Sequence, residues 1–131
     1  MALKRVLHVG VVVKDFESAI ERLRRFGLPC TERTEIKELG VKIGFLPIGD
    51  TAIEILSFTD PEKGKNSIVR LQKGAINHIC FEVDNLEFSI ADFEKGGARL
   101  VPGYPRVGAH GRVAFFSPET TEGVLIELCQ M

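Results

Sequence analysis

The sequence predicts an α+β fold built from two tandem copies of one strand–helix–three-strand unit, written βαβββ below. The strongest observation is that residues 7–15 and 77–84 follow one pattern, in which a histidine sits in an apolar run that ends at a helix start. These histidines, His8 and His78, are separated by 70 positions. The same offset relates further apolar and glycine positions: Phe16 to Leu86, Ile20 to Ile90, Leu23 to Phe93, Gly27 to Gly97 and Phe45 to Phe115. A period of about half the chain indicates an internal duplication.

Length and composition limit the organisation to one domain. The chain has 131 residues, 44% hydrophobic and 27% charged, which is typical of one globular domain. We therefore predict a single domain over residues 1–131, with a first unit at 1–58, a linker at 59–75 and a second unit at 76–131. Within the linker, residues 67–73 are predicted to form a short helix.

Charge and cysteine content predict a cytoplasmic protein that binds neither nucleic acid nor membranes. The net charge is −1, and no basic or acidic block is present. The apolar run near the N-terminus contains His8 and ends at Lys14, so it is too short and too polar for a signal or a membrane span. The three cysteines form no CxxC pair, which favours reduced thiols over a disulfide framework.

The first unit is predicted from its alternation of apolar runs and turn residues. A strand at 6–13 is followed by Asp15 as an N-cap and by an apolar helical stripe that ends at Gly27. Residues 31–38 read as a polar strand. Apolar strands follow at 41–48 and 51–58, joined by a turn at Gly49 and Asp50.

The second unit repeats this order. A strand at 76–83 leads to a helix capped by Asp84 or Asn85 and ended by Gly96 and Gly97. A short strand at 99–101 and a loop rich in glycine and proline at 102–111 follow. The last strands are predicted at 112–117 and 124–129, and the longer turn between them changes the offset between the units to 73.

Four polar side chains lie in the middle of strands that otherwise read as buried: His8, Glu54, His78 and Glu127. Each alone has an ordinary explanation, a hydrogen-bonded histidine or a glutamate on a solvated face. Together they form one His and one Glu at equivalent places in each unit, and a carboxylate in an apolar strand needs a partner. Two His and two Glu suit a divalent transition metal, leaving two open positions for a chelating substrate and Lewis-acid chemistry.

Several segments carry a resemblance to a known family. They are residues 45–51 with Ile53 and Glu54, residues 77–84, residues 105–111 and residues 123–128. With the paired units, these segments resemble the vicinal-oxygen-chelate superfamily of glyoxalases, bleomycin-resistance proteins and dioxygenases, and within it the methylmalonyl-CoA epimerases. The resemblance implies that the units form a curved mixed β-sheet around a metal-binding cleft. It also implies a metal-dependent isomerase that epimerises a CoA thioester through an enolate.

The resemblance also implies roles for particular residues. The metal ligands would be His8, Glu54, His78 and Glu127, holding a divalent ion for which Co²⁺ is favoured and Ni²⁺, Mn²⁺ or Zn²⁺ are alternatives. The two bases would be Glu127 and Glu38, although Glu38 also reads as a solvated residue of a charged stretch.

Substrate contacts and competing functions complete the prediction. Arg106 and His110 are candidate substrate-binding residues in the loop at 104–111, which also reads as a plain turn. Strand alternation places Cys80 and Cys129 on the face of the ligands, where packing is the simpler role. A homodimer is expected. The alternatives are a glyoxalase I-type lactoylglutathione lyase and a non-enzymatic drug-binding resistance protein of the same fold.

Overall fold

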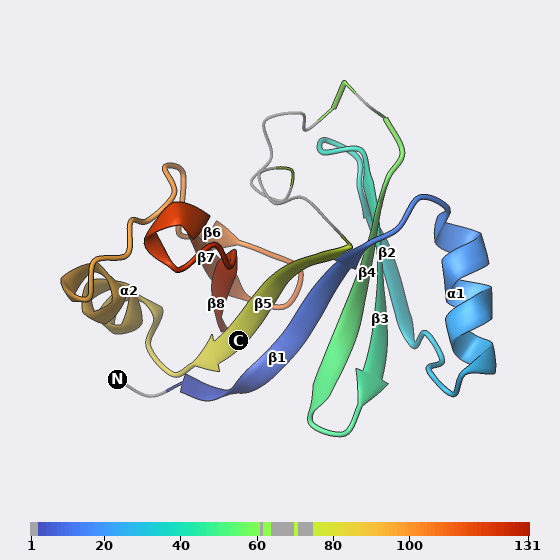
Figure 1. Ribbon diagram of the computed structural model, residues 1–131, viewed down its shortest axis with the longest axis horizontal. Helices are drawn as coiled ribbons and strands as arrows, with labels where there is room; N and C mark the ends of the chain where they lie inside the picture. The colour runs from blue at the N-terminus through green and yellow to red at the C-terminus, as the bar shows by residue number, and fades with distance from the viewer. Residues whose placement is uncertain (1–2, 61, 64–69, 71–74) are drawn as a thin grey trace. The chain divides into compact units, whose positions relative to one another are not determined.

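The computed structural model describes residues 3–60, 62–63, 70 and 75–131 (Figure 1). The chain divides into two compact units. The N-terminal unit is His8–Asn77, and the C-terminal unit is His78–Met131 together with Met1–Leu7. Strand β1 (Leu3–Val12) therefore contributes its first residues to the C-terminal unit and its last residues to the N-terminal unit.

The N-terminal unit is a mixed sheet with one helix. After β1 come α1 (Phe16–Arg25), β2 (Glu32–Ile36), β3 (Val41–Ile48) and β4 (Thr51–Phe58). The strands are ordered β2-β3-β4-β1, in which β1 runs parallel to β4 and the other neighbours are antiparallel. Strands β3 and β4 form a tight hairpin, because Gly49 adopts a φ of 59° that favours glycine at the turn.

The C-terminal unit repeats this plan. It contains β5 (Ile76–Val83), α2 (Leu86–Lys95), β6 (Arg106–Val107), β7 (Arg112–Phe116), a 3-10 turn (Pro118–Thr120) and β8 (Ile126–Gln130). The order β1-β5-β8-β7-β6 has β5 parallel to β8 and β7 antiparallel to β8. Lys4 and Arg5 of β1 form ion pairs with Glu82 of β5. The α+β class and the two βαβββ units are thus confirmed.

Equivalent residues begin and end the two helices. The Asp15 carboxylate accepts a hydrogen bond from the Ser18 backbone N–H at 2.9 Å, and the Asn85 side chain accepts one from Phe88 at 2.9 Å. Asn85, rather than Asp84, is therefore the second cap. Gly27 and Gly97 follow the helices with φ values of 93° and 101°, so both helices end in the left-handed conformation expected of glycine.

Each sheet has one face that is covered by its helix. In the N-terminal unit, Phe16 of α1 packs with Leu46 and Ile55, and in the C-terminal unit Leu86 and Ile90 of α2 pack with Phe116 and neighbouring residues. Neighbouring residues of a strand point to opposite faces. His8, Glu54 and Phe45 therefore point away from α1, and His78, Glu127 and Phe115 point away from α2.

Removing the cap of α2 should weaken the fold measurably. Asn85→Ala leaves the Phe88 N–H without this acceptor, so we expect a loss of about 1 kcal/mol in the free energy of unfolding, measured by urea denaturation. Asn85→Asp is the matched control, because the carboxylate keeps the acceptor at the helix N-terminus. A loss in Asn85→Ala no larger than in this control would argue against a stabilising cap.

The structure corrects several predicted boundaries. The strand predicted at 99–101 is a single bridge between Leu100 and Phe116, and the loop at 102–111 contains the short strand β6. Strand β2 ends at Ile36, not at residue 38, and β8 begins at Ile126 rather than at residue 124. Apart from Arg70, the helix predicted at 67–73 lies outside the described residues. Among the described residues, no helix is long and apolar enough to cross a membrane.

Candidate functional site

The N-terminal unit contains a buried His–Glu pair. His8 of β1 and Glu54 of β4 are each 6% exposed, and His8 Nε2 lies 3.6 Å from a Glu54 carboxylate oxygen. The pair forms because the parallel register sets Gly10 of β1 opposite Glu54, so that His8 lies two residues away on the same face. The ring of Phe45 meets the His8 imidazole edge-on, with centroids 6.1 Å apart.

The C-terminal unit contains the equivalent pair. His78 of β5 is 2% exposed and Glu127 of β8 is 7% exposed, with His78 Nε2 3.3 Å from a Glu127 carboxylate oxygen. Phe115 of β7 meets the His78 ring edge-on at 5.8 Å between centroids. Each histidine, its phenylalanine and its glutamate thus recur in the other unit, which extends the duplication from the backbone to side-chain contacts.

Thiols distinguish the two pairs. Cys80 faces Glu127 across the β5–β8 ladder, and its Sγ lies within 4.8 Å of a Glu127 carboxylate oxygen. A hydrogen bond with Cys129, burial and the charge of Glu127 all raise the pKa of the Cys80 thiol. This confirms that Cys80 shares the face of Glu127. The position opposite Glu54 in the N-terminal unit is Gly10, so only the C-terminal pair has a thiol at this place.

The donor atoms of each pair suit a divalent metal ion. Two ligand atoms about 2.1 Å from one ion are separated by about 3.0–3.4 Å at octahedral or tetrahedral angles. The pair distances of 3.3 and 3.6 Å lie near this range and exceed the ~2.9 Å of a typical N–H···O hydrogen bond. Buried carboxylates also require a compensating positive charge. Each unit therefore provides a nitrogen and an oxygen donor of the types that bind divalent transition metals.

The loop beside the C-terminal pair holds Arg106. Its guanidinium lies 4.4 Å from the centre of the Tyr104 ring, and Nη2 donates a hydrogen bond to the Tyr104 hydroxyl at 2.8 Å. Tyr104 in turn packs edge-on against Phe115 with centroids 5.2 Å apart. Burial raises the pKa of Tyr104, an effect that nearby Arg106 opposes and the charge of Glu127 reinforces. A chain of contacts thus joins Arg106 to His78 through Tyr104 and Phe115.

The remaining predicted residues lie in turns. His110 is half-buried in the bend before β7, at the point where the Gly108 N–H donates to the Gly111 carbonyl at 2.6 Å. A Cβ at Gly111 would overlap the Gln130 carbonyl, so this close approach requires glycine. Glu38 is exposed in the turn between β2 and β3. Each unit brings its own histidine and glutamate together, His8 with Glu54 and His78 with Glu127, whereas Glu38 lies in an exposed turn.

Sequence reasoning missed Tyr104 as a functional side chain. The chain has one tyrosine, placed in a loop rich in glycine and proline without periodicity. The available signal was the closeness of Tyr104 and Arg106 in the sequence, since an arginine two residues from an aromatic side chain can stack on its ring. The equivalent places of Phe45 and Phe115 in the two units were visible, but their contacts with the histidines were not.

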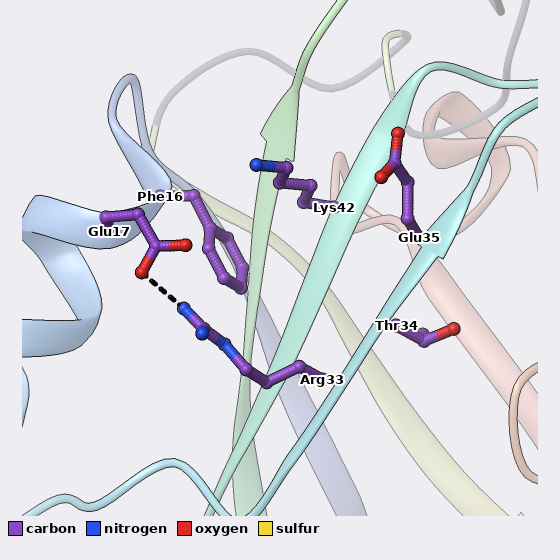
Figure 2. Close-up of a pocket in the computed structure, with 6 residues that line it drawn as sticks. All are labelled: Phe16, Glu17, Arg33, Thr34, Glu35 and Lys42. Carbon is purple, nitrogen blue, oxygen red and sulfur yellow. Dashed lines mark hydrogen bonds and ion pairs between the residues drawn. The ribbon is translucent and has the colours of Figure 1, made fainter.

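A second feature of the N-terminal unit lies on the side of α1. Figure 2 shows a pocket in which the Arg33 guanidinium crosses the Phe16 ring, 5.0 Å from its centre, and reaches Glu17 at 2.6 Å. The pocket is lined by Phe16, Glu17, Arg33, Thr34, Glu35 and Lys42. It contains two acidic and two basic side chains and none of the predicted site residues, so it joins α1 to the sheet rather than extending the His–Glu pair.

Comparison with known proteins gives a consistent set of relatives. The model of the family described as glyoxalase/bleomycin resistance protein/dioxygenase superfamily matches residues 7–116. The chain is 35% identical to the mitochondrial methylmalonyl-CoA epimerase of Homo sapiens, over 98% of this chain and 74% of that protein. It is 33% identical to the ethylmalonyl-CoA/methylmalonyl-CoA epimerase of Cereibacter sphaeroides, over 97% of this chain and 98% of that protein.

Solved structures agree. A methylmalonyl-CoA epimerase in complex with methylmalonyl-CoA and NH4⁺ matches with a TM-score of 0.84 and 27% identity, over 98% of this chain and 95% of that one. A variant of the Streptomyces coelicolor methylmalonyl-CoA epimerase in complex with 2-nitronate-propionyl-CoA has the same TM-score, identity and coverage.

Proposed function

Because the chain belongs to the glyoxalase/bleomycin resistance protein/dioxygenase superfamily, we propose that it is an epimerase that interconverts (R)- and (S)-methylmalonyl-CoA. The observation that carries this proposal is the similarity over nearly the whole chain to epimerases from a mammal and a bacterium. The buried His–Glu pair in each unit supports it, because the family resemblance assigns its metal ligands to these four positions.

The proposed metal ligands are His8, Glu54, His78 and Glu127. Their donor types and the spacing within each pair suit Co²⁺, the proposed ion, and also Ni²⁺, Mn²⁺ or Zn²⁺. A divalent ion bound by these residues would supply Lewis-acid stabilisation of negative charge on substrate oxygens.

Epimerisation requires proton transfer on both faces of the substrate α-carbon. One carboxylate removes the α-proton, and a carboxylic acid on the opposite side returns a proton, so no net charge is gained or lost. We assign these roles to Glu127 and Glu38. Glu127 is buried next to His78, where its carboxylate is shielded from water. Glu38 lies in an exposed turn, and we propose that it acts on the opposite face of the substrate.

Exchange of the α-proton with solvent tests this function directly. Purified protein loaded with Co²⁺ is incubated with methylmalonyl-CoA in D₂O, and loss of the α-proton signal is followed by NMR with and without EDTA. We expect catalysed exchange that EDTA abolishes and added Co²⁺ restores, because enolate formation exposes the α-carbon to deuterium. If the metal-loaded protein produces no exchange, the epimerase proposal is rejected. Assays with a glutathione hemithioacetal and with drug ligands then test the lyase and drug-binding alternatives.

Further properties follow as parts of the proposal. We propose a CoA thioester as the small-molecule partner, with Arg106 and His110 as its contacts, and a homodimer as the solution state. Strands β2 and β6, which end the strand orders of their units, provide edges for such assembly. Cys30, Cys80 and Cys129 form no disulfide, which supports a cytoplasmic location. Light scattering after size-exclusion chromatography distinguishes a dimer from a monomer.

A further inference from the structure

The environment of Arg106 differs from that of several other exposed arginines. Within the described part of the chain, Arg106 forms no ion pair with a carboxylate. Other arginines do so: Arg33 with Glu17, Arg99 with Glu119 and Arg112 with Glu87. The polar partner of Arg106 is instead the neutral Tyr104 hydroxyl, so the positive charge is held in place without being neutralised. An arginine arranged in this way is suited to a negatively charged ligand.

Tyr104 fixes this guanidinium in two ways. Its ring lies under the guanidinium at 4.4 Å, within the range of a cation–π contact, and its hydroxyl accepts the hydrogen bond from Nη2. A flexible, exposed arginine contributes little to binding, because ordering it costs side-chain entropy. The half-buried Tyr104 ring is itself packed against the buried Phe115. The guanidinium is therefore ordered before any ligand arrives.

The tyrosine hydroxyl acts on a ligand through Arg106. A phenolic oxygen can accept a hydrogen bond, and here it accepts one from the Arg106 guanidinium. Phe115, which packs on Tyr104, also contacts His78 and pairs with Glu127 across the β7–β8 ladder. The Tyr104–Arg106 pair is thus attached to the wall of the candidate metal site in the same unit.

We propose that Tyr104 and Arg106 form an oxyanion-binding pair for the acyl-CoA substrate, in which Tyr104 is the positioning residue and Arg106 supplies the charge. The proposal rests on the proposed function, which provides a substrate with two kinds of oxyanion, the free carboxylate of the acyl group and the phosphates of CoA. At the equivalent place in the N-terminal unit, the residue opposite Phe45 is Glu32, so no tyrosine holds an arginine there. The pair therefore makes the two units different in charge at equivalent places.

A double-mutant cycle tests the positioning role. Dissociation constants for methylmalonyl-CoA are measured by calorimetry at low temperature for the wild type, Tyr104→Leu, Arg106→Gln and the double variant. We expect each single variant to weaken binding about 10- to 50-fold, because a charge-assisted contact is lost or left unpositioned. The double variant should bind no more than about twofold worse than Arg106→Gln, since Tyr104 acts through Arg106. Independent, multiplicative losses would overturn the positioning role.

Two further variants separate this role from a structural one. Tyr104→Phe keeps the ring and its packing on Phe115 but removes the hydroxyl, and we expect binding to weaken about 3- to 10-fold with the thermal midpoint unchanged. In steady-state kinetics the loss should appear in KM rather than in kcat. Arg99→Gln is the matched control, an exposed arginine of the same unit that is already paired with a carboxylate. The proposal would be overturned if Tyr104→Leu and Arg106→Gln bound methylmalonyl-CoA with the dissociation constant of the wild type.

Truncated ligands identify which oxyanion is bound. CoA carries the phosphates without the acyl group, and methylmalonyl-pantetheine carries the carboxylate without the adenosine phosphates. If Arg106→Gln weakens only CoA, the pair binds phosphate, and if it weakens only methylmalonyl-pantetheine, the pair binds the carboxylate; either result supports it. One result would reject the epimerase function alone: the wild type binds these ligands, Tyr104→Leu binds them more weakly, and the wild type does not catalyse exchange of the α-proton. Exchange that is insensitive to both substitutions would reject the oxyanion pair alone.

Discussion

Glu127→Gln should lose both turnover and bound metal. The amide cannot accept the α-proton and is a poorer ligand than a carboxylate, so two proposed roles disappear in one substitution. We expect kcat/KM to fall by at least about 10³-fold, which corresponds to about 4 kcal/mol in transition-state stabilisation. Metal bound per chain, measured by plasma mass spectrometry after dialysis, should fall well below the wild-type value.

The unfolding free energy of the same variant provides an internal check. Glu127 is 7% exposed, and a buried carboxylate opposes folding when no cation compensates it. In the presence of EDTA, Glu127→Gln should therefore be at least as stable to urea as the wild type. Glu119→Gln, an exposed glutamate of the 3-10 turn in the same unit, serves as the control and should behave as the wild type. Turnover by Glu127→Gln within tenfold of the wild type would remove Glu127 from the mechanism.

Glu38→Gln should separate catalysis from metal binding. If Glu38 is the second base, the amide leaves one face of the substrate without a proton acceptor, and kcat should fall by about 10²- to 10⁴-fold. Metal content should equal that of the wild type, because Glu38 is exposed in the turn between β2 and β3 and is not one of the proposed ligands.

Glu35→Gln is the control for this substitution. Glu35 is an exposed glutamate of β2, three residues before Glu38, so it reports the effect of removing one negative charge from the same segment. Full activity in Glu38→Gln would identify this residue as a solvated turn residue. Wild-type activity in the control and loss in Glu38→Gln would support the second base.

Strands with strong periodicity were predictable to the residue. Strands β3, β4 and β5 begin and end where the sequence placed them, because apolar runs bounded by glycine or polar residues specify both length and turn. The residue before α2 was left open between Asp84 and Asn85, since both are good caps. The structure decides for Asn85 through its hydrogen bond to Phe88, a choice that depends on backbone geometry and not on residue type.

Short pairings in the C-terminal unit were not predictable. Strand β6 has two residues, so its sequence shows no alternation of apolar and polar side chains. It forms because Arg106 and Val107 pair with Val113 and Arg112 of β7. The predicted strand at 99–101 is reduced to one bridge for a related reason. The Val101 N–H donates to the Phe115 carbonyl and the Ser117 N–H donates to the Arg99 carbonyl, and these two bonds form the single pairing of Leu100 with Phe116. Pairings of this kind are set by tertiary contacts, which local sequence does not encode.

The candidate site was predictable where the duplication repeated it. His8 and Glu54 in one unit and His78 and Glu127 in the other are buried and adjacent, as their placement in apolar strands indicated. Tyr104 has no counterpart in the first unit, since the register sets Glu32 opposite Phe45. A comparison of the two units cannot identify a residue that occurs in only one of them. The proposed positioning role of Tyr104 therefore rests on its contacts with Arg106 and Phe115.

The edge-on contacts of Phe45 with His8 and of Phe115 with His78 affect when the imidazoles lose their freedom of rotation. A buried ring confined by an aromatic neighbour is restricted to one rotamer as soon as the chain folds. The conformational entropy of both histidines is therefore lost during folding, and a ligand that binds them later causes no further loss. The affinity of each histidine for a ligand thus depends partly on a phenylalanine that does not itself contact the ligand through a donor atom. The same preorganisation occurs in both units of the duplicated chain.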